Sequence, residues 1–566
     1  MTRPARRQPT RVRLLAACCA AGLLALGFPH GPLAGQEAGP AGFALGLTEL
    51  PREGLPPAVR RAVRSVKVLA DWSAIEPVQG RFEWGALDRA VAAAREQGLS
   101  PVGVLAFTPR WATLATGADL QQPAVYTRMP PRRLADWERF VRAAATRYRG
   151  AVSSWQVWTV PNLPHFRGTA GEYVALVRAA WRALAAVDRQ HRLVLPSPGG
   201  IDLVHARRLV QEAGEAVGVV EVRGDGRAPE TWLRPLATLR ARVLQGRPRP
   251  VWLEWSGEPA AGAFLRAVAA LRASGVERLF LSPDRLQRLE PAEAEAAVSL
   301  EALPFAGYLV RDPGTFLLVL GSGDRSVLVA WRPQGEAAVE VPLLPSARLL
   351  SPAGPLPPAA EGRTRLALSA RPLVVDGLDP ALVQEAQATL AQRGPLLPPP
   401  AAGRDYSAAG EVRIRLGPRP VEEGLLLVPP RRPETALEPV EVLGEAALRT
   451  NGRREAVFLY LDVDDTFLFF NDGRFVVEVT VEVLGARRDR TVGFNLLYDS
   501  DSGYRFTPWQ WVEARDGWVA YTLRLTDAAF ANTAGWDLAV NGGGNRVEEL
   551  TLRSVVVRKV PGGTGR

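Results

Sequence analysis

Residues 66–84 read VKVLADWSAIEPVQGRFEW, and this stretch sets the pattern of the N-terminal half of the chain. It opens with the short apolar run Val66–Ala70, typical of a buried strand, and leads into the helical pattern Gly85–Gln97. Seven further runs precede or follow similar helical patterns: Phe43–Leu47, Pro101–Ala106, Ser154–Trp158, Leu193–Pro196, Val219–Arg223, Val251–Glu254 and Arg278–Ser282. Strands alternating with helices over residues 40–303 predict a (β/α)8 TIM barrel, in which chemistry is expected where the strands end.

The pattern changes after residue 303 to short strands separated by glycine and proline turns. Residues 304–378 are predicted to form a small β-sandwich, and residues 405–561 a larger jelly-roll-like β-sandwich. Residues 379–404 contain the helical stretch Pro380–Gln392 and a proline-rich run, so they are expected to act as a linker.

Composition excludes several classes of function. The chain has 566 residues, 47% of them hydrophobic, and a net charge of +10. Its basic residues are scattered arginines, and Lys67 and Lys559 are the only lysines. Because these residues form no basic stripe, the sequence does not predict specific nucleic-acid binding. The diffuse positive charge leaves attraction to an acidic polysaccharide open.

Residues 1–36 have the features of a signal peptide, with an arginine-rich start, the apolar run Leu14–Phe28 and small residues after it. We therefore expect a bacterial protein that is secreted, periplasmic or at the cell surface. The alternative is an uncleaved anchor, and only then is membrane association expected. Both cysteines, Cys18 and Cys19, lie in this segment, and the histidines lack metal-binding spacing. We expect no metal and no other cofactor, while the oligomeric state is unknown.

Two motifs carry a resemblance to a known family. The spacing of Trp72, Ile75, Glu76, Gly80 and Trp84, followed by FTPRWA at residues 107–112, resembles clan A glycoside hydrolases. The likeness is greatest to family 39, the β-xylosidase and α-L-iduronidase group, and it extends over residues 40–303. It implies a retaining glycosidase site, with Asp71, Trp72 and Trp111 among the residues that contact the sugar.

The motif expected to hold the catalytic acid is altered. Residues 155–162 read WQVWTVPN, where family 39 has a tryptophan, asparagine and glutamate in the order W-N-E. The resemblance therefore places Trp158 and Thr159 in the sugar site and Val160 at the acid/base position. Removal of a general acid costs about 10²–10⁴ in rate, and valine cannot transfer a proton.

The nucleophile position is ambiguous. Residues 250–257 read PVWLEWSG, and the ungapped match to the family places Trp255 in the nucleophile slot. In that alignment Val251, Leu253 and Trp255 would face the barrel interior, and Glu254 would face the helices. A one-residue deletion would instead make Glu254 the nucleophile. The ungapped alignment is our prediction, because it avoids a bulky Trp252 inside the barrel.

A third alteration occurs on the sixth strand, where Arg223 stands at the position of a sugar-lining histidine in related families. Glu221, Asp71 and Asp225 are the carboxylates that could form a new acid pair with Glu254. Two functions remain: an exported, catalytically impaired pseudoglycosidase that binds polysaccharide or oligosaccharide, or an active retaining glycosidase with a rearranged acid/base and Glu254 as nucleophile.

The C-terminal region resembles jelly-roll accessory modules of polysaccharide-active proteins. Five aromatic residues either form a stacking platform for sugars or belong to the sandwich core: Tyr504, Trp509, Trp511, Trp518 and Trp536. Asp462, Asp464 and Asp465 either bind calcium or are turn residues or solvated charges, and the second alternative is the prediction.

Overall fold

The computed structural model describes residues 43–51, 55, 57–160, 165–196, 199–224, 226, 228–256, 262–322, 325–399, 403–545 and 549–562. The expected signal peptide and Asp225 lie outside these ranges. Within them, no helix is both long enough and apolar enough to cross a membrane.

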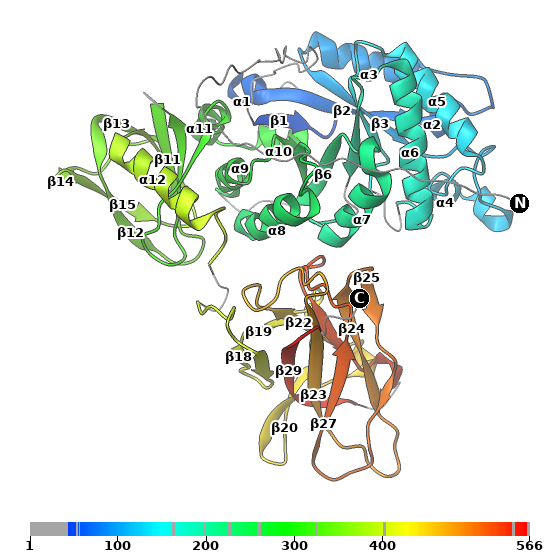
Figure 1. Ribbon diagram of the computed structural model, residues 1–566, viewed down its shortest axis with the longest axis vertical. Helices are drawn as coiled ribbons and strands as arrows, with labels where there is room; N and C mark the ends of the chain where they lie inside the picture. Colours follow the sequence, from blue (N-terminus) through cyan, green and yellow to red (C-terminus); the bar gives the residue numbers. More distant parts are fainter. Residues whose placement is uncertain are drawn as a thin grey trace, which may run out of the picture. The chain divides into compact units, whose positions relative to one another are not determined.

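Eight parallel strands form a closed barrel in the order of the sequence, which confirms the predicted fold class. Each strand is hydrogen-bonded to the strands before and after it, and β1 also pairs with β8 (Figure 1). The strands are β1 (Ala44–Leu47), β2 (Val63–Asp71), β3 (Ser100–Ala106), β4 (Ser154–Val157), β5 (Arg192–Pro196), β6 (Val219–Gly224), β7 (Val251–Trp255) and β8 (Arg278–Leu281).

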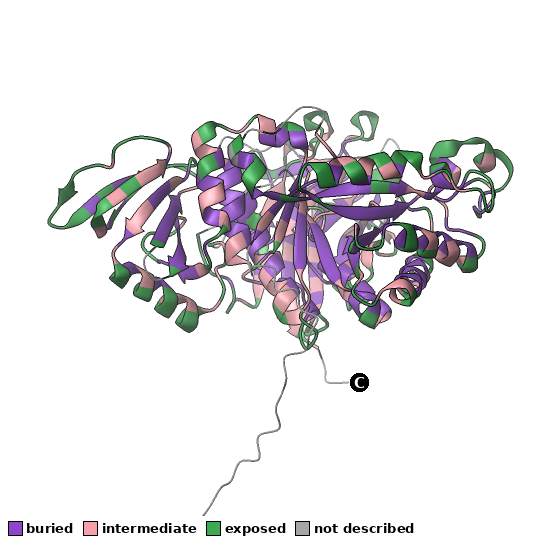
Figure 2. Cartoon of the chain, turned by 90° about the horizontal axis from the view of Figure 1, so that it is seen from above, coloured by how far each residue is buried: buried purple, intermediate pink, exposed green. Residues whose placement is uncertain are grey.

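Helices surround the barrel and bury one face each against the strands. Figure 2 shows strands buried along most of their length and helices with both buried and exposed faces. Local signals fix the helix starts: Thr169 and Glu172 form a capping box at α6, and Asp202 caps α7. The α-helices of this domain are α1 (Pro57–Ala62), α2 (Trp72–Ile75), α3 (Gly85–Glu96), α4 (Pro123–Tyr126), α5 (Leu134–Arg147), α6 (Ala170–Val187), α7 (Leu203–Ala213), α8 (Leu233–Thr238), α9 (Ala263–Ala273), α10 (Pro283–Gln287) and α11 (Pro291–Glu301).

The lower interior of the barrel is filled by apolar side chains from alternate strand positions. Five buried residues form this floor, namely Val102, Val194, Val219, Trp252 and Phe280. Trp252 and Phe280 lie 5.5 Å apart between ring centroids. Gly46 makes room for Phe280, because an added Cβ there would lie 2.6 Å from the Phe280 ring. The bulky Trp252 therefore fits inside the barrel, contrary to the premise of the ungapped alignment.

The second domain has two facing sheets, one of five strands in the order β13-β16-β11-β10-β9 and one of three in the order β12-β15-β14. Helix α12 (Pro380–Arg393) belongs to this domain by its packing, because Leu382 and Ala386 join the buried side chains between the sheets. Gly307 permits the close approach, since an added Cβ would lie 2.1 Å from the Ala386 carbonyl oxygen. The strands are β9 (Phe305–Tyr308), β10 (Phe316–Ser322), β11 (Arg325–Trp331), β12 (Ala337–Val341), β13 (Leu343–Ser351), β14 (Ala359–Ala360), β15 (Arg363–Leu368) and β16 (Leu373–Leu378).

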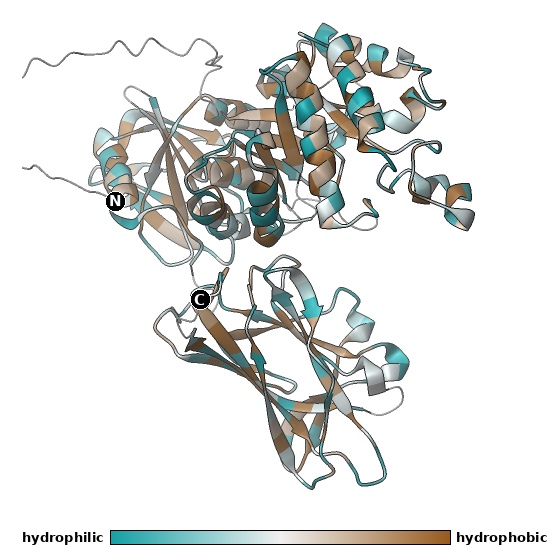
Figure 3. Cartoon of the chain, turned by 45° about the vertical axis from the view of Figure 1, so that its right-hand side comes forward, coloured by the Kyte–Doolittle hydropathy of each residue, from teal (hydrophilic) through white to brown (hydrophobic). Residues whose placement is uncertain are grey.

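The C-terminal domain is a second sandwich, with sheets of seven and six strands. Figure 3 shows hydrophobic residues along its strands. Alternation is strict in β22, where Leu459, Leu461 and Val463 face the core and the residues between them do not. The strands are β17 (Glu411–Arg415), β18 (Val421–Glu423), β19 (Leu425–Val428), β20 (Glu438–Val442), β21 (Glu445–Arg449), β22 (Phe458–Val463), β23 (Phe475–Leu484), β24 (Gly493–Ser500), β25 (Gly503–Phe506), β26 (Gln510–Trp511), β27 (Trp518–Leu525), β28 (Leu538–Asn541) and β29 (Thr551–Pro561).

Candidate functional site

Four charged side chains meet inside the barrel above its apolar floor. Lys67 on β2 places Nζ 2.8 Å from the Glu221 carboxylate on β6 and 2.5 Å from Glu254 Oε2 on β7. Arg223, two residues beyond Glu221, donates from Nη2 to Glu254 Oε1. Both oxygens of Glu254 are therefore engaged by cations. We call these four residues the barrel charge cluster.

The members of the barrel charge cluster differ in depth. The side chains of Lys67 and Glu221 are 6% and 4% exposed, whereas those of Glu254 and Arg223 are 15% and 26% exposed. The Lys67 ammonium also lies 4.8 Å from the centre of the Phe280 ring in the floor. Lys67 and Glu221 thus form the buried lower layer, and Glu254 and Arg223 lie nearer the mouth, at the C-terminal ends of their strands.

The electrostatic environment separates the two glutamates. Burial raises the pKa of Glu221 above its ordinary value, although Lys67 opposes the shift. Burial acts in the same direction on Glu254, but Lys67 and Arg223 together hold the pKa of that carboxyl below its ordinary value. The two carboxylates raise the pKa of Lys67 against its desolvation, so the amine stays protonated.

The two carboxylates lie close together, as in a retaining glycosidase, but the space between them is not open. Because one ammonium contacts both carboxylates, the nearest Glu221 and Glu254 oxygens lie at most 5.3 Å apart. Retaining enzymes hold their two carboxyl groups about 5–5.5 Å apart, with the sugar between them. Here the space between the two oxygens is occupied by the Lys67 ammonium. The arrangement is that of a neutralised buried ion network.

The residues at the expected acid position offer no proton donor. Val160 is buried just beyond the end of β4, and Thr159 beside it is half-buried. Trp158 is fully buried in a left-handed backbone conformation with φ of 70°, and its Nε1 donates to the His165 carbonyl at 2.7 Å. Its assignment to sugar contact is corrected, because a ring without exposed surface cannot stack on a ligand.

The residues after β2 mainly hold the loop in place. Asp71 caps α2 by accepting from Ser73 N at 2.9 Å and from Ala74 N at 3.3 Å. Trp72 is fully buried, and its Nε1 donates to Glu76 Oε2 at 2.7 Å. The predicted role of Trp72 in sugar binding is therefore corrected, because its ring has no exposed surface on which a sugar could stack.

Trp111 is half-buried and serves the same loop. Its Nε1 donates to the Glu76 carbonyl at 2.8 Å, and its ring meets that of Trp72 edge-on at 5.7 Å. The Glu76 carboxylate in turn pairs with Arg139 at 2.7 Å. The family-like motif that began with Trp72 therefore supports the barrel structurally through an aromatic and ionic network.

The predicted orientation of β7 is wrong. The parallel register pairs Arg223 with Glu254, so both side chains point into the barrel. Trp255 points outward, where its ring meets Trp232 edge-on at 5.3 Å and lies 5.0 Å from the Arg285 guanidinium. The prediction failed because it excluded a tryptophan from the interior, whereas Trp252 packs there against Phe280 and three valines.

Lys67 is the member of the charge cluster that sequence reasoning did not select. A signal was present in the run Val66–Ala70, where Lys67 is the only residue that is not apolar, because a lysine is rarely buried unless it is paired. Its partners could not be identified from the sequence, since they lie 154 and 187 residues away.

A second candidate site lies on the outer face of the six-stranded sheet in the C-terminal domain. Phe458 and Tyr460 alternate with core leucines on β22 and stack on each other with 5.6 Å between centroids. Trp536 lies 5.1 Å from Tyr460 and 4.4 Å from Tyr504. All four rings are half-buried and lie outside the core of the sandwich. We call these four rings the aromatic row.

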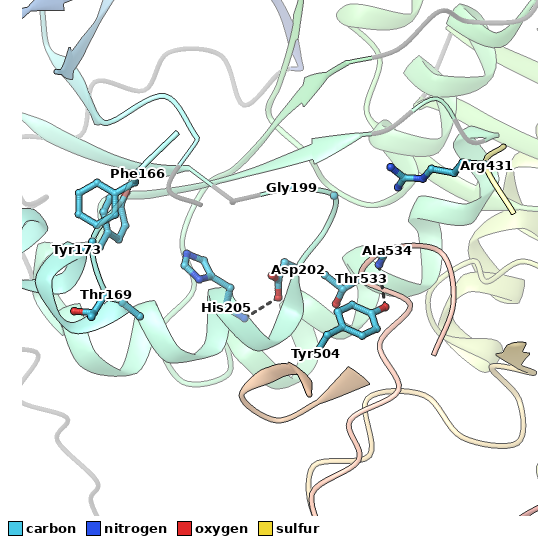
Figure 4. Close-up of a pocket in the computed structure, with 13 residues that line it drawn as sticks. Phe166, Thr169, Tyr173, Gly199, Asp202, His205, Arg431, Tyr504, Thr533 and Ala534 are labelled. Carbon is cyan, nitrogen blue, oxygen red and sulfur yellow. Dashed lines mark hydrogen bonds between the residues drawn. The ribbon is translucent and has the colours of Figure 1, made fainter. Parts of the chain in front are cut away.

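Backbone hydrogen bonds fix one end of the aromatic row. The Tyr504 hydroxyl donates to the Trp536 carbonyl at 2.5 Å and accepts from Ala534 N at 3.2 Å, as Figure 4 shows for the second contact. A cleft of about 580 Å³ opens over Phe458, Tyr460 and Trp536. Tyr504 and Trp536, two of the five aromatic residues selected from the sequence, thus belong to the aromatic row.

The other platform candidates lie elsewhere. Trp509 and Trp511 pair with each other at 6.0 Å, and Trp518 contacts the Arg553 guanidinium at 5.0 Å. None of these three lines the cleft. Asp464 accepts from Thr466 N at 2.8 Å and from its hydroxyl, a turn contact as predicted. In the described ranges, no group of three acidic, histidine or cysteine side chains is arranged to bind a metal.

Comparisons with known proteins give similarity of fold. No protein-family model matches the chain, and no curated protein matches it. A family 39 glycoside hydrolase from the gut symbiont Bacteroides cellulosilyticus WH2 is 13% identical, with a TM-score of 0.45 over 59% of this chain and 80% of that one. A GH30 endoxylanase from Clostridium papyrosolvens C71 is 9% identical, with a TM-score of 0.43 over 59% and 96%. A glucosidase from Croceicoccus marinus is 13% identical, with a TM-score of 0.37 over 92% and 95%.

Proposed function

We propose that this chain is an exported, glycoside-hydrolase-like protein that binds polysaccharide and has lost efficient hydrolysis. The observation that carries the proposal is the engagement of both Glu254 oxygens, one by Lys67 and the other by Arg223. A glycosidase nucleophile must release a lone pair toward the anomeric carbon, and two charge-assisted bonds oppose that release. The family 39 resemblance of residues 72–84 supports the derivation of the barrel from a glycosidase.

The second requirement of a retaining mechanism is a proton donor to the leaving group. Val160 occupies the expected position and has no ionisable group. Glu221 is close to Glu254, but it is buried beneath it and bound to Lys67. A sugar would have to displace the Lys67 ammonium to reach it. We therefore assign the barrel charge cluster to stabilising the barrel.

Binding is assigned to the aromatic row of the C-terminal domain. The C–H faces of sugars stack on aromatic planes, and half-buried rings outside the core are available for this contact. The alternation of Phe458 and Tyr460 with buried leucines places both rings on one side of the sheet. Export through the segment 1–36 would bring this surface to extracellular polysaccharides.

One observation favours the alternative, an active glycosidase. The pKa of Glu221 is raised and that of Glu254 is lowered, as expected of an acid paired with a nucleophile. In this mechanism Glu254 would attack the anomeric carbon, and Glu221 would protonate the leaving oxygen. The two functions differ in whether Glu254 reacts at all.

The test uses aryl glycosides with activated leaving groups, which need little protonation. We expect no burst of phenol release, no rescue by azide, and retention of the protein on an insoluble polysaccharide. A burst that Glu254→Gln abolishes would establish Glu254 as a nucleophile and refute the loss of catalysis. Rescue of turnover by azide in the same protein would show that only the acid/base is missing.

A further inference from the structure

The cleft over the aromatic row combines sugar-stacking surfaces with positive charge. Phe458, Tyr460 and Trp536 form its floor, and residues 428–432 contribute one wall. Arg431 and Arg432 are both exposed at this wall. The rings present an apolar surface, in which Trp536 is tilted by 55° from Tyr460, and the two arginines line the same cleft.

The two arginines differ in their partners. Arg432 Nη2 donates to Glu455 Oε2 at 3.1 Å, so its charge is compensated within the cleft. Arg431 has no carboxylate partner in the described part of the chain. It lies close enough to Tyr460 that its charge lowers the pKa of that hydroxyl, against the larger effect of burial, which raises it. Arg431 therefore lines the cleft together with Tyr460 and Trp536, without a carboxylate partner in the described part of the chain.

We propose that this cleft binds acidic oligosaccharides, with a uronate carboxylate on Arg431 and the sugar ring on Tyr460 and Trp536. The inference rests on the proposed polysaccharide-binding function and specifies its ligand class. A guanidinium forms two parallel hydrogen bonds to a carboxylate, which a neutral sugar cannot replace. The net charge of +10 adds a weaker, non-specific attraction to acidic polymers.

The cleft is large enough for a short oligosaccharide. Its volume of about 580 Å³ lies within the range of about 300–1,000 Å³ typical of small-molecule sites. The centroid distances of 5.6 and 5.1 Å between neighbouring rings make the floor continuous. Successive sugar units can therefore contact neighbouring rings while one carboxylate meets Arg431.

The experiment measures binding of the full-length mature protein to polygalacturonate and to carboxyl-reduced polygalacturonate at 150 mM salt. We expect binding to the acidic polymer to be about tenfold tighter, which corresponds to about 1.4 kcal/mol, because the bond between a guanidinium and a carboxylate is charge-assisted. Arg431→Ala should remove about that factor, and Arg431→Lys should restore part of it. Trp536→Ala should weaken binding to both polymers about fivefold.

Two control variants test whether binding depends on the cleft itself or on any exposed arginine or aromatic ring of the domain. Arg487→Ala removes an exposed arginine from another loop of the same domain, and Trp511→Ala removes an exposed ring outside the cleft. Both should bind like the unmodified protein. If Arg487→Ala weakens binding as much as Arg431→Ala, diffuse charge explains the affinity and the cleft assignment is refuted.

The remaining outcomes distinguish the two proposals. Equal affinity for the acidic and the carboxyl-reduced polymer would refute the acidic ligand class and leave polysaccharide binding intact. Lack of binding to every polysaccharide offered, with circular dichroism showing a folded protein, would refute the proposed function itself.

Discussion

Replacement of Lys67 by methionine tests whether the barrel charge cluster stabilises the fold. The ammonium bridges Glu221 and Glu254, and the variant leaves these carboxylates in a buried site without it. Arg223 still pairs with Glu254, so the orphaned group is Glu221. Methionine has a similar length and no charge, which isolates the electrostatic contribution.

The expected cost can be calculated in two ways. Two carboxylates whose nearest oxygens lie at most 5.3 Å apart repel by about 3 kcal/mol or more at an effective dielectric constant of 20. Keeping Glu221 protonated instead, at pH 7 against an unfolded pKa of 4.5, costs about 3.4 kcal/mol. Both values agree with the 3–5 kcal/mol typical of breaking a buried ion pair. We therefore expect Lys67→Met to lower the free energy of unfolding of the barrel by about 3–5 kcal/mol at pH 7.

The measurement is hydrogen exchange by mass spectrometry in increasing urea, which reports the barrel separately from the other domains through peptides from β2 and β6. The cost should shrink at pH 5, where the orphaned Glu221 takes up a proton more easily. Lys67→Met combined with Glu221→Gln should recover at least half of the loss. A single variant that differs from the unmodified protein by less than 1 kcal/mol, or a double variant without recovery, would refute this account of the cluster.

Three further outcomes are expected. Trp252→Ala should destabilise the barrel by about 3–5 kcal/mol in the same exchange measurement, because it leaves a cavity in the apolar floor. Unchanged stability would show that the neighbouring side chains move in to fill the cavity. Gly103→Ala should lower the midpoint of thermal unfolding, since its Cβ would lie 2.4 Å from the buried Trp155 ring; an unchanged midpoint would contradict that contact. The pKa of Asp499 is raised to about 6 by burial, so its contribution to stability is present at pH 4 and is lost as pH rises to 6. Asp499→Asn should reduce this pH dependence of unfolding in urea, and an unaltered slope would assign it to other groups.

Some properties of the barrel could be inferred from single positions. Val160 cannot act as a general acid or base whatever its surroundings, because no environment makes a valine transfer a proton. Side chains alternate between the two faces along β22, so Phe458 and Tyr460 lie on the face opposite the core leucines. The importance of Lys67 was less visible, since a single charge in a strand does not identify its counter-ions.

The strand-helix alternation of the sequence determined the (β/α)8 barrel, and short strands between glycine and proline turns determined the sandwiches, because both patterns are local and repeat many times. The orientation of β7 was decided only by the tertiary structure. Whether Trp252 or Trp255 points inward depends on the packing of the barrel interior, where Trp252 meets Phe280 on β8. The role of Glu254 depends in turn on Lys67, which is 187 residues away. Side chains alternate with a period of two whichever face of the strand points into the barrel, so the sequence pattern does not choose the face. Only the side chains that folding brings next to a carboxylate show whether it is free to react or is neutralised by cations.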